Sequence, residues 1–120
     1  MAWEFSVNKP IFEQISDRII LAIISGKIKS GEKIEAVRDL AVTAGVNPNT
    51  VQRALASVEQ TGLIYTKRGE GRYVTEDENV IISAKSKYLK NITENFINTV
   101  KGLGIETSQI VKIIKESEDK

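Results

Sequence analysis

The chain has 120 residues, of which 41% are hydrophobic and 28% are charged, an ordinary globular composition that can bury one modest core. It contains no cysteine and no histidine, which excludes disulfides and thiolate metal sites and removes the usual general base. We therefore expect no enzyme and no metal or cofactor site. The formal net charge is only +1, so nucleic-acid binding would depend on where the basic residues lie. The longest apolar run, residues 19–24, is too short to span a bilayer, which predicts a soluble, cytoplasmic protein without a membrane partner.

Three helices are expected in the first half of the chain. The first covers residues 11–25, where isoleucines recur on one helical face, and Gly26 is a suitable terminating residue. A turn and a very short strand lead to a second, shorter helix over residues 36–45. The third helix covers residues 48–61 and ends at Gly62. The turn TAGVN between the second and third helices has the length and glycine content of a helix-turn-helix.

Local signals specify the start of the third helix. Asn47 is a good N-cap, because its side-chain oxygen can accept a hydrogen bond from an unpaired amide of the first turn. Pro48 falls at the first helical position, where its missing N–H costs nothing. Val46 and Val51 occupy the two positions of a hydrophobic staple, which orients the entering chain.

Two short strands and two further helices are expected in the rest of the chain. The stretches LIYTK and RYVTE, joined by the glycine-containing turn RGEG, predict a β-hairpin. An amphipathic pattern then predicts one long helix that ends at GLG, residues 102–104, followed by a last helix capped by Thr107 or Ser108. The fold class is mainly α with a small β-hairpin, with one domain over residues 1–75 and a helical domain over residues 76–120.

The long helix carries its apolar residues on one side. Ile82, Leu89 and Phe96 follow each other at intervals of seven. Two helices cannot bury such faces alone, so they must pack on the first domain or on a second copy. We favour a homodimer over a ligand pocket, because the helical domain leaves little volume for a cavity of about 300–1,000 Å³. A small-molecule effector stays open but is not expected in this tail. The expected dimerisation residues are Ile82, Tyr88, Leu89, Ile92, Phe96 and Val100.

Polar side chains gather on the opening turns of the third helix. Asn49, Gln52 and Arg53 are residue types that read base edges, since Asn or Gln pairs with adenine and Arg pairs with guanine. Thr50 is better suited to a backbone phosphate. Taken alone, the cluster could equally be a solvated helix face.

Several motifs in order resemble one family of regulators. The stretches are PIFEQISDRI, SGKIKSGEKI, VRDLA, GVNPNTVQRAL and EQTGLIYTKRGEGRYV, which together cover residues 10–75. They resemble the winged helix-turn-helix DNA-binding domain of the GntR family of bacterial transcription regulators. The short two-helix tail is similar to that of the YtrA-like subfamily, whose small C-terminal domain pairs two protomers. The resemblance implies a homodimeric regulator, expected to be a repressor, on a two-fold double-stranded DNA operator, and YtrA-like relatives often control transporter genes.

The resemblance also implies which residues meet DNA. In this family, the arginine of the second helix approaches the DNA, and the glycine backbone of the wing lies against it. Arg38 matches that arginine, with a salt bridge to Asp39 or Asp17 as the alternative. The turn KRGEGR matches the wing, with a plain hairpin turn as the alternative. The expected DNA-binding residues are Arg38, Asn47, Asn49, Thr50, Gln52, Arg53, Lys67, Arg68, Gly69, Gly71 and Arg72.

The sequence departs from the family before the second helix. Regulators of this type usually read Leu-Pro-Ser there, whereas this chain has Ile34, Glu35 and Ala36, with Asp39 at the place of the acid of a capping box. Alanine cannot cap a helix, and Glu35 sets a negative charge near the expected phosphates. A winged helix used only for protein contacts is the alternative function, but it would not need the polar helix start and the basic wing together.

Overall fold

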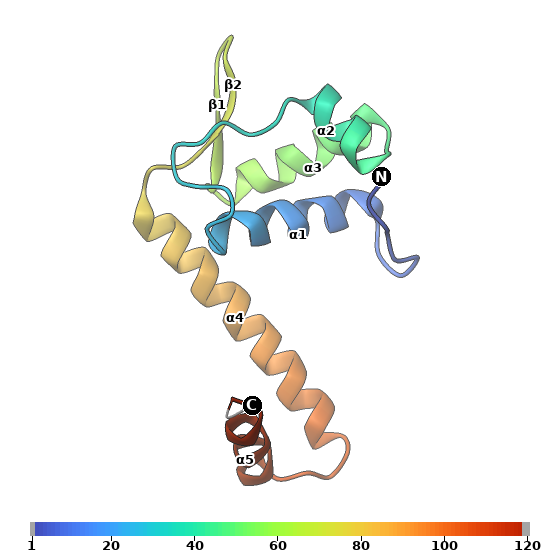
Figure 1. The fold of residues 1–120 in the computed structure, drawn as a ribbon, viewed down its shortest axis with the longest axis vertical. Helices are drawn as coiled ribbons and strands as arrows, with labels where there is room; N and C mark the ends of the chain where they lie inside the picture. The colour runs from blue at the N-terminus through green and yellow to red at the C-terminus, as the bar shows by residue number, and fades with distance from the viewer. Residues whose placement is uncertain (1, 119–120) are drawn as a thin grey trace. The chain divides into compact units, whose positions relative to one another are not determined.

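The structure, a computed structural model, describes residues 2–118 (Figure 1). Within these residues the chain forms five helices and two strands: α1 (Ile11–Ile24), α2 (Val37–Ala44), α3 (Pro48–Gln60), β1 (Ile64–Lys67), β2 (Gly71–Val74), α4 (Glu78–Lys101) and α5 (Thr107–Glu118). The expected fold class, mainly α with a small β-hairpin, is confirmed. Contacts divide the chain into two compact units, residues 1–85 and residues 86–120.

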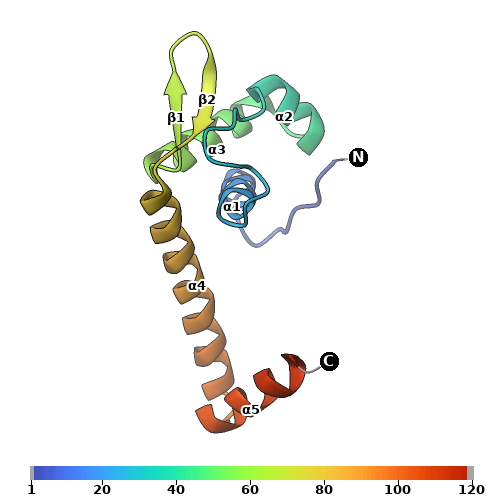
Figure 2. The ribbon, with the colours of Figure 1, turned by 60° about the vertical axis from the view of Figure 1, so that its left-hand side comes forward.

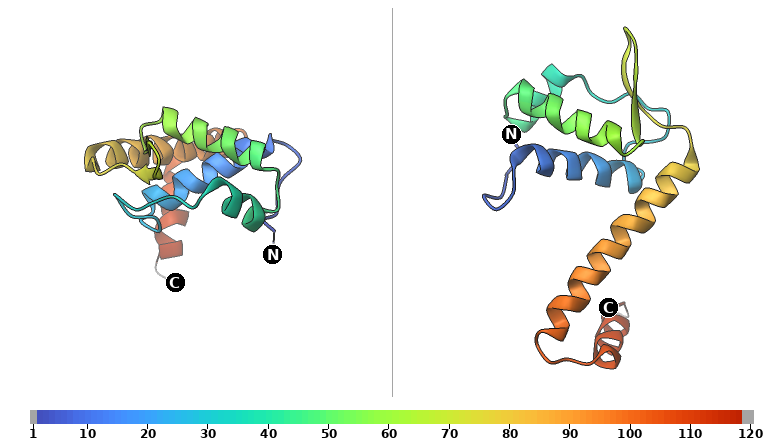
Figure 3. Two further views of the ribbon diagram at one scale, coloured as in Figure 1. Left: turned by 90° about the horizontal axis from the view of Figure 1, so that it is seen from above. Right: turned by 180° about the vertical axis from the view of Figure 1, so that it is seen from behind.

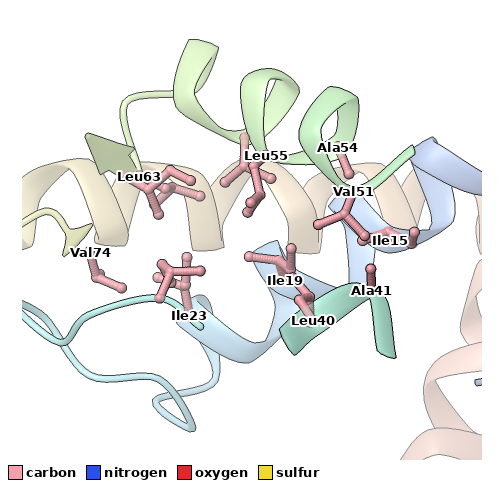
Figure 4. Close-up of a cluster of buried hydrophobic side chains, with 13 residues drawn as sticks. Ile15, Ile19, Ile23, Leu40, Ala41, Val51, Ala54, Leu55, Leu63 and Val74 are labelled. Carbon is pink, nitrogen blue, oxygen red and sulfur yellow. The ribbon is translucent and has the colours of Figure 1, made fainter. Parts of the chain in front are cut away.

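The core of the first unit lies between α1, α2, α3 and the base of the hairpin. α1 and α3 pack side by side, with α2 against α3 (Figure 3). The core side chains are almost all aliphatic and meet at the centre of this arrangement (Figure 4). The largest fully buried side chains are Ile15, Val51, Leu55, Val58, Leu63, Ile64 and Val74. Burial of these apolar surfaces supplies most of the free energy that holds the helix-turn-helix together.

The helix ends at the turn between α2 and α3 follow local signals in the sequence, whereas α5 begins at Thr107, so Thr107 and Ser108 lie inside that helix and do not cap it. Asn47 caps α3, since its side-chain oxygen accepts a hydrogen bond from the Asn49 amide at 2.7 Å, and Pro48 is the first helical residue. Gly45 ends α2 in the left-handed region with a φ of 73°. Ala36, in contrast, precedes α2 with no side-chain cap. The turn of the helix-turn-helix is therefore well specified on its α3 side and weakly specified at the start of α2.

The start of the N-terminal arm, residues 2–3, lies against this turn. The backbone amide of Trp3 donates to the Ala44 carbonyl at 3.2 Å, and the Arg18 guanidinium carbon lies 3.9 Å from the Trp3 ring centre. A Cβ atom built on Gly45 would lie 2.5 Å from the Cβ of Ala2. The arm thus requires glycine at residue 45 for space as well as for conformation.

The hairpin stands out from the helices of the first unit (Figure 2). Its strands are antiparallel, with Thr66 opposite Arg72 and Lys67 opposite Gly71. The short strand expected before α2 is present as a single bridge from Lys33 to Tyr73, and the Ile34 amide donates to the Arg72 carbonyl at 2.8 Å. This third segment braces β2 and so supports the base of the hairpin.

α4 begins in the first unit and continues into the second. Val80, Ile81 and Ala84 pack against the core of the first unit, which explains why that unit includes the start of the helix. Among the described residues, α4 has no buried side chain, and α5 has one, Ile110. Large apolar side chains of the two helices are therefore exposed: Ile82, Leu89, Ile92, Phe96, Val111, Ile113 and Ile114.

Candidate nucleic-acid interface

One face of α3 is buried and the other carries the polar residues. Every third or fourth residue points into the core, because the helical repeat brings Val51, Leu55 and Val58 to one side. Gln52 and Arg53 consequently lie on the exposed side. These side chains lie outside the buried core and are exposed to a ligand.

The first turn of α3 uses some of its polar groups internally. The side chain of Asn47 is engaged in the cap, and the Thr50 amide donates to the Asn47 carbonyl at 3.0 Å. Asn49 is exposed and Thr50 is half-buried. Within the described part of the chain, the side chains of Asn49 and Gln52 make no hydrogen bond. Asn49 and Gln52 therefore keep both donor and acceptor capacity for base edges, whereas Asn47 mainly shapes the helix start.

Arg53 is held by an aromatic ring of α1. Its guanidinium carbon lies 3.9 Å from the ring centre of Phe12, a cation–π contact. Both residues line an open hollow of about 390 Å³, together with Pro10, Ile11, Asn49 and Thr50. The start of α1 and the start of α3 thus form one continuous surface. The stacked guanidinium has fewer accessible conformations than a free side chain, so it loses less entropy on contact with a base or a phosphate.

Arg38 lies on the first turn of α2 and is exposed. Among residues 2–118 it has no ion-pair partner, so the alternative of a salt bridge to Asp39 or Asp17 is not observed. Asp17 is instead bonded to Lys9, with 2.5 Å between the Lys9 Nζ and an Asp17 carboxylate oxygen. Glu35 accepts a long hydrogen bond from the Thr43 hydroxyl at 3.4 Å, so its carboxylate lies at the surface of α2.

The wing carries two exposed basic side chains near its turn. The ammonium of Lys67 lies 4.5 Å from the ring centre of Tyr73, and Arg68 is exposed at the turn. Gly69 has a φ of 79° and open space around it. Gly71 has a φ of 115°, and a Cβ there would meet the Lys33 side chain at 3.0 Å. The turn therefore needs glycine conformations, and it presents its basic groups outward as a wing would.

Arg72 differs from the other basic residues of the wing. Its side chain is 19% exposed, and its Nε lies 3.4 Å from the Glu59 Oε1 of α3. The hydroxyl of Thr66, which faces Arg72 across the hairpin, donates to the same Glu59 oxygen. Its residue type predicts a DNA contact for Arg72, and the structure places the Nε of that side chain against Glu59 of α3.

Two residues of this surface are not predicted as site residues by the sequence. Phe12 and Glu59 lie in the stretches PIFEQISDRI and EQTGLIYTKRGEGRYV that resemble the family, but the sequence assigns no DNA contact to either. No local signal in the sequence indicates their roles, because Phe12 meets Arg53 and Glu59 meets Arg72 only in the folded structure. Elsewhere, the described residues hold no group of three or more acidic, cysteine or histidine side chains that could bind a metal ion. Among the same residues, no helix is both long and apolar enough to cross a membrane.

Known proteins share both this sequence pattern and this fold. Residues 11–74 match the family model for bacterial regulatory proteins of the gntR family. The transcriptional repressor YtrA of Bacillus subtilis (strain 168) is 33% identical over 110 residues, which is 91% of this chain and 85% of YtrA. The structure of a GntR family transcriptional regulator from Listeria monocytogenes matches with a TM-score of 0.88 and 42% identity, over 93% of this chain and 98% of that chain.

A solved complex with DNA extends the comparison to a bound state. AraR(DBD) in complex with operator ORX1 matches with a TM-score of 0.56 and 25% identity, over 62% of this chain and 95% of that chain. The family model covers more than half of the chain, and YtrA and the Listeria structure match over nearly its whole length. The chain therefore belongs to the GntR family of bacterial regulatory proteins.

Proposed function

We propose that this GntR regulator is a sequence-specific repressor that binds a two-fold DNA operator as a homodimer. The observation that carries the proposal is the exposed face of α3, where Asn49, Gln52 and Arg53 stand on a capped helix start beside a basic wing. A helix presented in this way enters the major groove and reads base edges with its first turns. The match to AraR(DBD), solved with its operator, supports the same mode of binding.

Each residue has a distinct proposed role on the DNA. Asn49, Gln52 and Arg53 read bases, and Thr50 meets a phosphate near the start of α3. Arg38 approaches the backbone from α2. In the wing, Lys67 and Arg68 meet phosphates or the minor groove, with the backbones of Gly69 and Gly71 against the DNA. Residues 1–75 would thus form the DNA-binding domain.

The tail, residues 76–120, is proposed to pair two protomers. Its exposed apolar side chains support this, since Ile82, Leu89 and Phe96 are 59%, 63% and 46% exposed. An apolar surface of this kind is costly in water and is typical of an interface. Pairing places two recognition helices on half-sites one or more helical turns apart. We assign dimerisation to the tail, and no effector.

Repression is supported by the similarity to YtrA, which is a transcriptional repressor. On the resemblance to the YtrA-like subfamily, we extend the proposal to control of a transporter operon. A cytoplasmic location follows from the same proposal, because the operator is chromosomal DNA.

Selection of bound sequences from a random duplex pool tests the function. The selected duplex is then titrated at several salt concentrations with the parent protein, Gln52→Ala and Arg53→Ala. We expect a palindromic sequence, a steep salt dependence, and a base preference that is relaxed in the variants. Failure to enrich any sequence would favour the second candidate, a winged helix that binds proteins and not specific DNA.

A further inference from the structure

The recognition helix and the wing are joined at one carboxylate. Glu59 lies near the end of α3, and the same oxygen, Oε1, accepts a hydrogen bond from the Thr66 hydroxyl and lies 3.4 Å from the Arg72 Nε. Thr66 belongs to β1 and Arg72 to β2, and the two are direct partners across the hairpin. Glu59 therefore contacts both strands of the wing at one cross-strand pair, Thr66 and Arg72.

The contact between Glu59 and Arg72 is largely sheltered from water. The Glu59 and Arg72 side chains are 30% and 19% exposed. The Arg72 Nε atom is buried and makes no hydrogen bond within the described residues. Its N–H has left water, so the nearby carboxylate is what compensates its charge. Removing the carboxylate charge would leave that guanidinium half-buried and uncompensated, which favours a different position of the hairpin.

We propose that Glu59 is a positioning residue for DNA recognition, which fixes the wing against α3 through Thr66 and Arg72. The proposal rests on the proposed function, in which α3 and the wing contact one DNA duplex. With the wing fixed, Lys67 and Arg68 meet the backbone in register with the base contacts of α3. Arg72 then acts within the protein, as the anchor of the wing.

The direction of the change in DNA affinity distinguishes a positioning role of Glu59 from a simple effect of its charge. Glutamate carries a negative charge near a polyanion, so its neutralisation should by itself strengthen DNA binding. Loss of a positioning contact should weaken binding instead. Glu59→Gln keeps an oxygen that can accept from Thr66 but removes the charge facing Arg72. Glu70→Gln is the matched control, because Glu70 is exposed in the wing turn and its side chain has no partner among the described residues.

The experiment measures the affinity of the full chain for its selected duplex over a range of salt concentrations, with a thermal unfolding curve for each variant. We expect Glu59→Gln to weaken binding about twofold to fivefold, the range of a partly buried ion pair, while Glu70→Gln binds as tightly as the parent or more tightly. Thr66→Val removes the hydrogen bond without any change of charge, and it should weaken binding in the same direction. It also provides a second test if Glu59→Gln does not fold.

A double-mutant cycle shows whether Glu59 acts through the wing. Lys67→Ala with Arg68→Ala should reduce the salt slope of the parent by about 2, one for each phosphate contact. In the Glu59→Gln background the same pair should have a smaller effect, because the wing is already displaced. The inference is overturned if Lys67→Ala with Arg68→Ala has the same effect on binding in the Glu59→Gln background as in the parent. It is also overturned if Glu59→Gln binds as tightly as Glu70→Gln. Either result leaves the proposed function intact. If the parent protein enriches no duplex, the proposed function itself is refuted.

Discussion

Replacing Ala36 by serine should supply the side-chain cap that α2 lacks. Ala36 has φ −60° and ψ 149°, and its carbonyl accepts the first helical hydrogen bond from the Leu40 amide at 2.9 Å. The backbone is thus already that of an N-cap residue, and only the side-chain acceptor is missing. A serine hydroxyl there can accept from the amide of Asp39, whose carboxylate can in turn bond the serine amide as in a capping box.

The size of the effect follows from known cap energies. A good N-cap contributes ~0.5–2 kcal/mol relative to alanine. For a unit of this size, 1 kcal/mol corresponds to a Tm change of about 4–8 °C. We therefore expect Ala36→Ser to raise the Tm by at least about 2 °C, measured by circular dichroism. Ala56→Ser is the control, since it makes the same change at an exposed position inside α3, where serine lowers helix stability.

Adding Glu35→Pro should improve DNA binding as well. The Glu35 amide makes no hydrogen bond within residues 2–118, so proline removes no donor that the fold uses. The change also removes a negative charge beside the expected phosphates, and affinity for the selected duplex should rise most at low salt. A Tm of Ala36→Ser at or below that of the parent would refute the capping argument. An unchanged or lower affinity of the double variant would refute the electrostatic one.

Three further predictions address the turn, Arg53 and the tail. Gly45→Ala should destabilise the fold by about 1–2 kcal/mol in denaturant unfolding, because its φ of 73° is left-handed and its Cβ would clash with Ala2. An unchanged midpoint would show that the arm and the turn adjust freely. Phe12→Leu should weaken DNA binding about twofold to fivefold by releasing Arg53, and the loss should vanish in an Arg53→Ala background. Phe5→Leu, another half-buried aromatic against the core, controls for stability, and an equal loss there would refute a specific role for Phe12. Leu89→Asp should give a monomer in sedimentation and weaken operator binding, whereas Lys90→Asp on the same helix should leave a dimer; a monomeric parent at micromolar concentration would contradict the dimer.

Local signals in the sequence determined where α3 starts and where α2 and α3 end. Asn47 and Pro48 begin α3, and Gly45 and Gly62 lie at helix ends with positive φ. These signals act over one turn of chain, so they can be read without knowing the fold. The glycine-containing turn between two strand-like segments predicted the hairpin for the same reason. The absence of a capping side chain at Ala36 was equally visible, and the structure confirms it.

Tertiary structure alone decided which partner each charged side chain has. By residue type, Arg53, Lys67, Arg68 and Arg72 are equivalent candidates for DNA contact. In the folded chain Arg53 stacks on Phe12 of α1, and Arg72 turns to Glu59 of α3. These partners are distant in sequence, and a charge interacts with whatever lies within a few ångströms in space. Sequence periodicity can place such a side chain on a face, but only the packing of α1, α3 and the hairpin determines what that face meets.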